Sequence, residues 1–431
     1  MTVLGELFRF SWPTLGLEAE LSRFVERRDA LVAELLIASV GLANGHATRR
    51  LLHRSNLNLL AAETRGRLAK DLTERVDSVP WRDVLEQLVF LSIERWREGE
   101  PTIDLRAVDP DARSRWFVRP YLEYGGPTVL FAPGGSGKSY LASALAITIA
   151  SGEPLFGQLC ARPGPVLYLD WETDEYTHAE RLRALCRGAD LPALPPVFYR
   201  RMSASLAESL PIVQRELGRL GAVAAIVDSL AAARGGEPES AEVTNQSFSA
   251  VRAIRVPTVL VDHVSKASMV TPAMGSAHLT PFGSVFTENR ARNTWSVHRS
   301  GEEDAQEFAV ALVHEKTNNG RRERRHAYTL SFTSALDRQG EERLLAARLR
   351  PCDLAGVADF EVRLSLAERI MRHLAAQPDG TTDPSEAATV LGVDRQAVAV
   401  RLSDLKRRGR VVYLADRRRY ALAAHHQEET G

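Results

Sequence analysis

The hydrophobic pattern of the chain changes twice, and its middle part carries the clearest structural signal. From about residue 119 to 350, short apolar runs rich in β-branched residues alternate with segments of helical spacing. A run such as Ala225-Ile226-Val227 is apolar without interruption, which is typical of strands buried on both faces of a parallel sheet. The last strands are separated by short charged turns, which favour an antiparallel extension. We therefore predict an α/β domain with strands at Thr128–Phe131, Val166–Asp170, Ala224–Asp228, Thr258–Asp262, Thr294–His298, Phe308–His314 and Tyr328–Phe332.

The first 118 residues have a different pattern. Apolar residues recur at helical spacing in Leu17–Leu42 and in Trp81–Trp96. Thr73–Asp77 and Gly99–Thr102 look like breaks between helices. We find no chemical motif here, so we expect residues 1–118 to form a helical docking or oligomerisation region.

Residues 361–425 form a third unit. Its pattern predicts three helices followed by a short strand, a turn at Asp416–Arg419 and a second strand. This is the element order of a winged helix-turn-helix domain. The tail His425–Gly431 is expected to be disordered. The predicted elements are the helices Leu364–Ala376, Pro384–Leu391 and Asp394–Arg408 and the strands Val411–Leu414 and Tyr420–Leu422.

Composition narrows the class of protein. The 431 residues are 44% hydrophobic and 26% charged, with a formal net charge of zero, so any basic surface must be local. Leu31–Leu42 and Leu141–Ala150 are the most apolar stretches, and both are shorter than a membrane span. The three cysteines are far apart and the N-terminus lacks a signal-peptide pattern, so we expect a cytoplasmic protein with no membrane partner.

A glycine-rich segment follows the first predicted strand of the central region. Ala132-Pro133-Gly134-Gly135-Ser136-Gly137-Lys138-Ser139 lies between that strand and an apolar helix, which is the setting of a nucleotide phosphate-binding loop, or P-loop. Glycines let backbone N–H groups converge on phosphates, Lys138 can reach the β- and γ-phosphates, and Ser139 can ligate Mg²⁺. The usual first glycine is replaced by Ala132, a small residue that the position tolerates. The sequence therefore predicts that Pro133 to Ser139 bind ATP with Mg²⁺.

Three later strand ends supply polar residues that such a site needs. Asp228 ends an apolar strand and can hold Mg²⁺ through water, although a strand-end aspartate can also be structural. Glu172 follows the strand after the P-loop helix and is our candidate base for orienting water, with Asp170 and Asp174 as alternatives. Glu172 could instead cap the next helix. His263 could sense the γ-phosphate or be structural.

With these features in order, the central region resembles the RecA-like ATPases, and within them the hexameric replicative helicases of the RepA and DnaB type. An acid on the second strand, Glu172, distinguishes RecA-like proteins from the AAA+ class. The acidic loop Gly235–Ser240 after Val227-Asp228-Ser229-Leu230 and the segment Gly283–Phe286 leading to Arg292 are also similar to the RepA-like group. The resemblance covers roughly residues 119–335 and implies a RecA-like P-loop core in residues 119–350.

The resemblance also implies a ring of subunits, expected to be a hexamer, with ATP at each interface. Arg292 stands at the place of the arginine finger that reaches the neighbour's γ-phosphate, and Arg290 is a close alternative. The loop Ala267–Pro281 stands where the family binds single-stranded DNA in the ring channel. One departure is Lys316-Thr317-Asn318, where DnaB-type helicases carry a Lys-x-Arg pair. That missing arginine places the finger role on Arg292.

Basic residues cluster in the C-terminal unit of a chain that is neutral overall. In a winged helix-turn-helix domain the second helix of the pair lies in the major groove and the wing contacts the backbone. A protein-docking role is the alternative. The predicted DNA contacts are Arg395, Gln396, Arg401, Arg407, Arg408 and the wing-tip residue Arg418.

Three functions fit these observations. The first is an ATP-dependent motor, a RepA-like hexameric replicative helicase that moves on single-stranded DNA and engages duplex DNA through the C-terminal unit. The second is a repair or recombination ATPase of the RecA or RadA type, which would form filaments. The third is an ATP-switched DNA-binding regulator.

Overall fold

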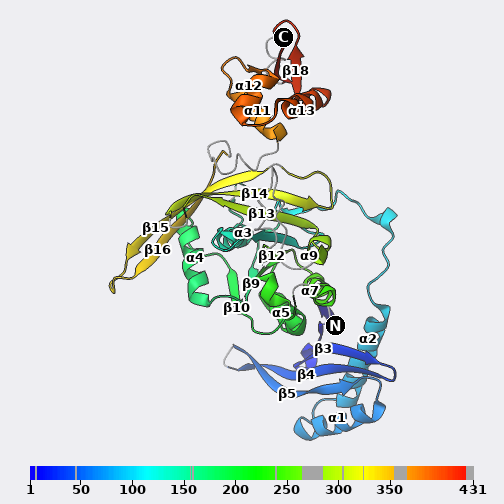
Figure 1. Cartoon of the computed structure of the whole chain (residues 1–431). Coiled ribbons are helices and arrows are strands. Elements are labelled where there is room, and N and C mark those ends of the chain that lie inside the picture. Colours follow the sequence, from blue (N-terminus) through cyan, green and yellow to red (C-terminus); the bar gives the residue numbers. More distant parts are fainter. Residues whose placement is uncertain are drawn as a thin grey trace.

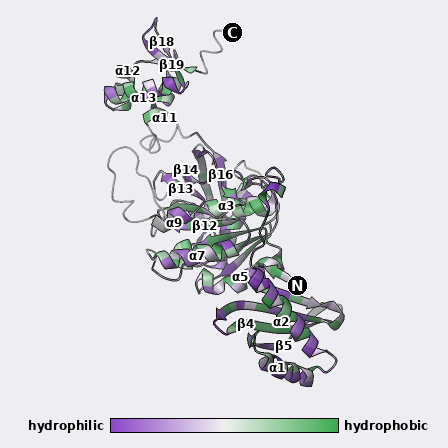
Figure 2. Cartoon of the chain, turned by 90° about the vertical axis from the view of Figure 1, so that its right-hand side faces the viewer, coloured by the Kyte–Doolittle hydropathy of each residue, from purple (hydrophilic) through white to green (hydrophobic). Residues whose placement is uncertain are grey.

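The computed structural model of the chain describes residues 1–4, 7–43, 46–155, 157, 160–237, 240–264, 285–302, 305–323, 325–353 and 366–423. An N-terminal domain, a central α/β domain and a small C-terminal domain follow one another along the chain (Figure 1). The two smaller domains lie at opposite ends of the central domain in both views (Figure 1 and Figure 2). The predicted loop Ala267–Pro281 and the predicted tail His425–Gly431 lie outside the described residues.

A nine-stranded sheet forms the centre of the α/β domain, in the order β10-β9-β11-β12-β8-β13-β14-β15-β16. The strands from β10 to β13 are parallel, whereas β13 to β16 pair antiparallel. The predicted α/β fold, with a mostly parallel sheet and an antiparallel extension, is confirmed. The strands are β8 (Thr128–Ala132), β9 (Val166–Asp170), β10 (Val197–Arg201), β11 (Ala224–Asp228), β12 (Thr258–His263), β13 (Asn293–Ser300), β14 (Glu307–Thr317), β15 (His326–Leu336) and β16 (Glu342–Pro351). A separate pair, β6 (Trp116–Val118) and β7 (Leu122–Glu123), precedes them.

Helices cover both faces of this sheet, which explains why its strands are apolar on both sides. Along β8, Leu130 belongs to one hydrophobic core with α3 and α4, and Val129 and Phe131 belong to a second core with α5, α6 and α7. Every residue of α3 from Leu141 to Ala150 is buried. Figure 2 shows hydrophobic residues concentrated in the strands and in α3. The helices are α3 (Lys138–Ser151), α4 (Glu175–Gly188), α5 (Leu206–Leu220), α6 (Leu230–Ala233), α7 (Ala241–Ala253) and α9 (Val285–Arg290).

The prediction of a helical N-terminal region is wrong for its first half. Leu17–Leu42 is not a helix but two long strands of a five-stranded antiparallel sheet with the order β1-β2-β3-β4-β5. The predicted helix at Trp81–Trp96 is present as α2. The sheet packs against α1 and α2 in one hydrophobic core. The elements are β1 (Thr2–Leu4), β2 (Leu7–Trp12), β3 (Leu17–Arg27), β4 (Ala30–Ala43), β5 (His46–Asn58), α1 (Ala62–Arg75) and α2 (Trp81–Glu98).

The misprediction has a physical origin in the spacing of the apolar residues. Leu31, Ala33, Leu35 and Ile37 are buried, and they alternate with less buried residues, as one face of a strand requires. The same segment is rich in Leu, Ala and Glu, which favour helices in isolation. Pairing with β3 and β5 and burial against the two helices outweigh that preference.

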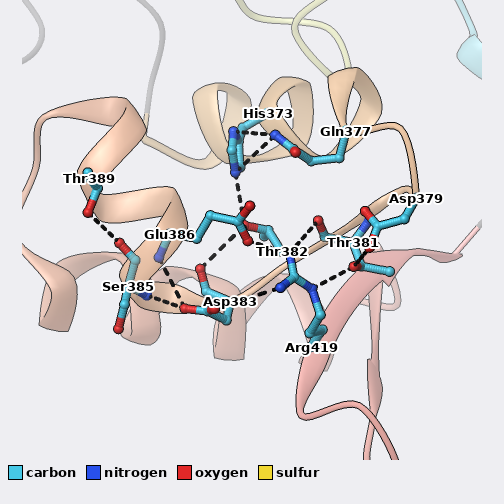
Figure 3. A network of polar contacts seen from close by, with 10 residues as sticks. All are labelled: His373, Gln377, Asp379, Thr381, Thr382, Asp383, Ser385, Glu386, Thr389 and Arg419. Atoms are coloured by element: carbon cyan, nitrogen blue, oxygen red, sulfur yellow. Dashed lines mark hydrogen bonds and ion pairs between the residues drawn. The ribbon is translucent and has the colours of Figure 1, made fainter.

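The C-terminal domain contains the predicted helices and hairpin together with a short strand, β17, that the pattern did not predict. Arg419 Nε donates to Thr381 Oγ1 over 2.6 Å, and its guanidinium also pairs with Glu386 (Figure 3). His373 Nε2 lies 2.9 Å from Thr382 Oγ1 in the same network. These contacts join the hairpin to β17 and α12, so Arg419 is a structural residue. The elements are α11 (Leu366–Ala376), β17 (Thr381–Thr382), α12 (Pro384–Leu391), α13 (Arg395–Arg407), β18 (Val411–Leu414) and β19 (Arg419–Leu422).

A buried carboxylate joins the N-terminal and central domains. Glu20 on β3 accepts a hydrogen bond from Arg215 Nε of α5 over 2.7 Å, and its side chain is only 4% exposed. Arg9 and Arg49 lie 3.4 and 3.5 Å from the same carboxylate. The N-terminal domain therefore has an ionic attachment to α5. No helix in the described part of the chain is long and apolar enough to cross a membrane.

A neutral histidine holds the antiparallel part of the large sheet to β8. His314 Nδ1 accepts the N–H of Glu323 over 2.9 Å, so Nε2 carries the proton and lies 2.7 Å from Asn293 Oδ1. Asn293 in turn donates to Thr128 Oγ1 over 3.2 Å. The imidazole stacks on Trp295 with ring centroids 4.3 Å apart. Burial lowers the pKa of His314 to about 4.

This histidine should make the fold sensitive to acid. Since the pKa is lower in the folded chain than its ordinary value of 6.5, His314 contributes stability in full above about pH 6.5 and loses it as the pH falls towards 4. The loss is at most about 1.4 kcal/mol per pH unit. In thermal melts, His314→Gln should therefore show a smaller decrease in Tm between pH 7.5 and pH 5 than the wild type. Equal decreases would show that His314 does not titrate as the structure indicates.

Candidate functional site

The P-loop connects β8 to α3 at the carboxyl edge of the parallel strands. Gly135 and Gly137 have φ angles of 70° and 84°, a left-handed conformation that favours glycine. Gly137 is the residue before α3 and provides no side-chain cap. The first N–H groups of α3 therefore face the loop, where the positive end of the helix dipole attracts anions. The predicted loop, Pro133 to Ser139, thus has the backbone form of a phosphate cradle.

Lys138 is the first residue of α3 and is buried at the base of the loop. Its Nζ donates to the carbonyl oxygens of Ala132 and Pro133, both over 2.9 Å. Burial lowers the pKa of the ammonium group, and the negative charges of Asp228 and Glu172 oppose this shift. The ammonium group is thus held inside the loop, facing two of the predicted acids.

Glu172 lies where three strand ends meet. Its Oε1 accepts a hydrogen bond from Ser229 Oγ and lies 3.3 Å from His263 Nε2. The contact with His263 is the main cause that lowers the pKa of Glu172; burial opposes it, and Ser229 and Lys138 reinforce it. The side chain nevertheless remains 39% exposed. Glu172 is therefore an ionised carboxylate that is fixed in direction and open to solvent, as a general base requires.

The two alternative bases have structural roles. Asp174 caps α4 by accepting the N–H groups of Tyr176 and Thr177, at 2.8 and 2.9 Å. Asp170 is fully buried and accepts from Thr173 N and from Tyr199 Oη. Burial raises the pKa of Asp170, but the nearby His178, whose Nε2 lies 3.5 Å from Asp170 Oδ1, and hydrogen bonds from backbone N–H groups outweigh it and bring the pKa to about 2. Since Asp174 occupies the cap, Glu172 does not serve as one.

Asp228 ends β11, next to the strand that leads to Glu172. It is buried, and Tyr168 Oη donates to its Oδ2 over 2.7 Å. Burial raises the pKa of Asp228, and the hydrogen bond from Tyr168 opposes the rise. The predicted donors to Mg²⁺ are the Asp228 carboxylate and the Ser139 hydroxyl, and such oxygens are the ligands that this ion prefers. The residues present therefore fit a magnesium ion bound beside the P-loop.

A cavity of about 450 Å³ borders the P-loop. Three aromatic rings line it, and Tyr140 meets Phe332 edge to face with centroids 5.0 Å apart. Arg299 stacks on Phe308 and donates to the Gly135 carbonyl over 3.0 Å, which ties the cavity to the loop. Sequence reasoning missed this cavity, because it forms only when β14, β15 and β16 pair. Its lining residues are Gly135, Ser136, Gly137, Lys138, Ser139, Tyr140, Arg181, Arg299, Ala305, Gln306, Phe308, Phe332, Ser334 and Glu342.

Arg292 is the predicted catalytic residue that lies apart from the others. It precedes β13, whose first residue Asn293 pairs with Thr128 at the end of β8 opposite the P-loop. The length of β8, about 13 Å, separates these two ends of the sheet. Lys138, Glu172, Asp228 and His263 are together at one edge, and Arg292 is exposed at the other.

The backbone and stem of Arg292 are nevertheless held in place. Its carbonyl oxygen accepts the N–H of Asn318 over 3.0 Å, and Lys316 Nζ donates to the Asn289 carbonyl over 3.3 Å. A Cβ built on Gly126 would come within 2.7 Å of Arg292 Cγ. Gly126 has an ordinary φ, so within the described ranges the reason for glycine at this position is the room that it leaves for the Arg292 side chain.

The six predicted nucleic-acid residues are all exposed; four are on α13, Arg408 directly follows this helix, and Arg418 is on the hairpin turn. Asp404 pairs with three neighbouring arginines, at 2.7 Å from Arg407, 3.0 Å from Arg408 and 3.7 Å from Arg401. The described residues 366–423 contain eleven Lys and Arg against seven Asp and Glu, so the domain stays basic despite this pairing. Arg418 is at the turn with a φ of 54°. Exposed and basic, this surface is compatible with a nucleic-acid interface.

Comparison with known proteins finds a family model that is similar to the central part of the chain. Residues 97–269 match the AAA domain family. No curated protein matches the sequence. A KaiC-like protein from the hyperthermophilic archaeon Pyrococcus horikoshii OT3 is similar in structure, with 13% identity over 53% of this chain and 93% of that chain and a TM-score of 0.35.

Two further solved structures are similar at the same level. One is an ATPase domain with 13% identity, with 48% of this chain and 82% of that chain covered and a TM-score of 0.36. The other is a DnaB-like replicative helicase with 14% identity. The similarity covers 64% of this chain and 75% of that chain, with a TM-score of 0.38. The family match includes the P-loop and the positions of Glu172, Asp228 and His263, so this part of the chain is similar to the AAA domain family.

Proposed function

We propose that the chain is an ATP-driven motor on DNA, a replicative helicase of the RepA type whose subunits hydrolyse ATP at their interfaces. The observation that carries the proposal is the separation of Arg292 from the other site residues. Lys138, Glu172, Asp228 and His263 gather at one edge of the sheet, and Arg292 is held at the opposite edge and exposed. A finger in this place is unsuited to its own subunit's nucleotide and suited to a neighbour's. A closed ring, which we propose is a hexamer, repeats this pairing at every interface.

Each residue of the cluster then has a defined role. Lys138 exchanges the carbonyls of Ala132 and Pro133 for phosphate oxygens, which pair better with its charge. Glu172, held by Ser229 and His263, accepts the proton of the attacking water. His263, in contact with Glu172, would sense the γ-phosphate. Mg²⁺, held by Ser139 and Asp228, would neutralise charge on the phosphates.

We further propose that the C-terminal domain is a winged helix that binds duplex DNA. The order α11, β17, α12, α13 and a two-stranded hairpin supports it, with α13 presented as the groove-binding helix. Arg395, Gln396 and Arg401 would face the bases, and Arg407, Arg408 and Arg418 would contact phosphates. Binding through such contacts should weaken steeply as salt is raised.

The aromatic cavity beside the P-loop gives the proposal a test of nucleotide recognition. We expect the adenine and ribose of ATP to occupy it, and Phe332→Ala should then raise the KM for ATP about tenfold, because base stacking contributes roughly 1–3 kcal/mol. Leu336→Ala, in the same strand but 72% exposed, is the matched control and should leave the KM unchanged. An unchanged KM in Phe332→Ala would place the nucleoside elsewhere.

The central experiment measures the ATPase rate with and without single-stranded DNA, together with the oligomer mass in ATP. A motor should form closed rings, hydrolyse ATP faster on DNA and unwind a forked duplex, and Lys138→Ala should lose the last two. Filaments on single strands would support the recombination ATPase instead. An ATPase rate that no DNA affects, with sequence-specific duplex binding, would support the regulator and contradict the motor.

A further inference from the structure

A buried ion pair lies behind the catalytic acids. Arg234 Nη2 is 3.2 Å from Asp262 Oδ2, and both side chains are completely buried. The same Nη2 donates to Thr287 Oγ1 over 3.0 Å. These three residues come from the end of α6, from β12 and from α9, so one guanidinium joins three elements that are far apart in the sequence.

Burying two charges has a large desolvation penalty, so this ion pair is stable only in a well-defined geometry. Two charges removed from water lose their hydration, and only well-placed partners compensate for that loss. Burial raises the pKa of Asp262 to about 6, while the charge of Arg234 opposes this shift. The backbone N–H of His263 also donates to Asp262, over 3.0 Å. The ion pair therefore holds a particular arrangement of α6, β12 and α9.

Two arms of this network lead to Glu172. Along the first arm, Arg234 directly follows the single turn of α6, which starts after Ser229, and Ser229 donates to Glu172. Along the second arm, Asp262 directly precedes His263, which also contacts Glu172. The ion pair thus fixes, relative to each other, the two segments that hold the candidate base.

The third arm leads to the opposite edge of the sheet. Thr287 is in the middle of α9 and is completely buried, and its carbonyl oxygen accepts the N–H of Ala291 over 3.1 Å. Arg292 is the next residue. A movement of Arg234 would therefore reach Arg292 through one short helix.

We propose that Arg234, Asp262 and Thr287 form a positioning network that couples the nucleotide site containing Glu172 to Arg292 of the same subunit. A shift of Ser229 or His263 on nucleotide binding or hydrolysis would pass through Arg234 to α9 and change the placement of Arg292. Since Arg292 serves the next subunit, the network makes one site sensitive to the state of its neighbour. This inference rests on the proposed function, because it needs an assembled ring with the finger acting between subunits.

The test uses Thr287, since replacing Arg234 would leave a buried, unpaired carboxylate and could unfold the chain. Thr287→Val keeps the shape and removes the hydroxyl, and Thr287→Ser keeps the hydroxyl. Thr244→Val is the matched control: Thr244 is completely buried on α7, and its hydroxyl has no hydrogen-bond partner within the described ranges. The full-length protein is assayed for ATPase rate against ATP concentration, with oligomer mass and Tm recorded for each variant.

The wild type should hydrolyse ATP with a Hill coefficient above one. Thr287→Val should bring the coefficient to about one and lower kcat about fivefold, the low end of coupling between sites, without changing the oligomer mass. Thr287→Ser and Thr244→Val should behave as wild type.

Several results would overturn the inference. They are wild-type cooperativity in Thr287→Val, loss of cooperativity in Thr287→Ser as well, and a wild-type ring that hydrolyses ATP without cooperativity. All three leave the proposed function standing. A wild type that hydrolyses no ATP, or hydrolyses it as a monomer, would instead contradict the proposed function itself.

Discussion

Arg292→Ala should lower kcat for ATP hydrolysis about 1,000-fold, because an arginine finger stabilises the charge that develops on the transferred phosphoryl group. ATP binding should change little, since Lys138 and the rest of the P-loop lie at the other edge of the sheet. The decisive measurement mixes two inactive proteins. Arg292→Ala retains a complete P-loop, and Lys138→Ala retains the finger, so mixed rings should regain part of the wild-type rate.

Arg290→Ala is the matched control for this experiment. Arg290 is also exposed and ends α9, two residues before Arg292, but the stem contact with Gly126 belongs to Arg292 alone of the two. Arg290→Ala should retain most of the activity. If it loses the activity and Arg292→Ala does not, the finger is Arg290. If mixing restores nothing, the arginine does not act between subunits.

Glu172→Gln should reduce kcat by about 100- to 10,000-fold, the usual range for removing a general base. Glutamine has nearly the same shape and can still accept from Ser229, but it cannot take a proton from water. The affinity for ATP should be retained, so the variant should bind nucleotide, assemble and fail to turn over. The measurements are kcat for the ATPase and the Kd for ATP.

Asp174→Asn is the control for Glu172→Gln. Asparagine caps helices as well as aspartate does, so α4 should keep its start and the enzyme its rate. A large loss in Asp174→Asn with little change in Glu172→Gln would reverse the assignment of the base. The lowered pKa of Glu172 adds a second check, because the carboxylate stays ionised below its ordinary pKa of 4.5. Protonation of Glu172 should therefore not limit the rate until the pH falls below that value.

The sequence predicts the central sheet well because burial on both faces leaves a simple signature. β9 and β11 begin and end at the predicted residues, and β8 differs by one. β10 and β16 are the strands of this sheet that were missed; both are edge strands that contain Arg residues, at the end of β10 and between apolar residues in β16. Few of their residues are buried, so their sequences lack the continuous apolar run that marks the inner strands. The N-terminal strands were predicted as helices for another reason. Their composition favours helices and concealed the alternation of buried and less buried residues.

The candidate site also has a part that the sequence predicts and a part that it does not. Lys138, Glu172 and His263 stand beside strands that could be recognised, and their places follow from the parallel order of those strands. The hydrogen bond between Ser229 and Glu172, the role of Asp174 as a cap and the aromatic cavity depend on side-chain packing between distant segments. Arg234 and Thr287 carry no local signal at all. Their partnership becomes visible only when α6, β12 and α9 are brought together.

The close approach of Gly126 to Arg292 limits which residues can occupy these two positions in related chains. Its backbone conformation is open to any residue, and among the described residues it is the stem of Arg292 that a Cβ would meet, at 2.7 Å. Positions 126 and 292 should therefore vary together among related chains. Lineages that keep the arginine should keep the glycine, and lineages that have lost the arginine are free to carry alanine or a larger residue at 126.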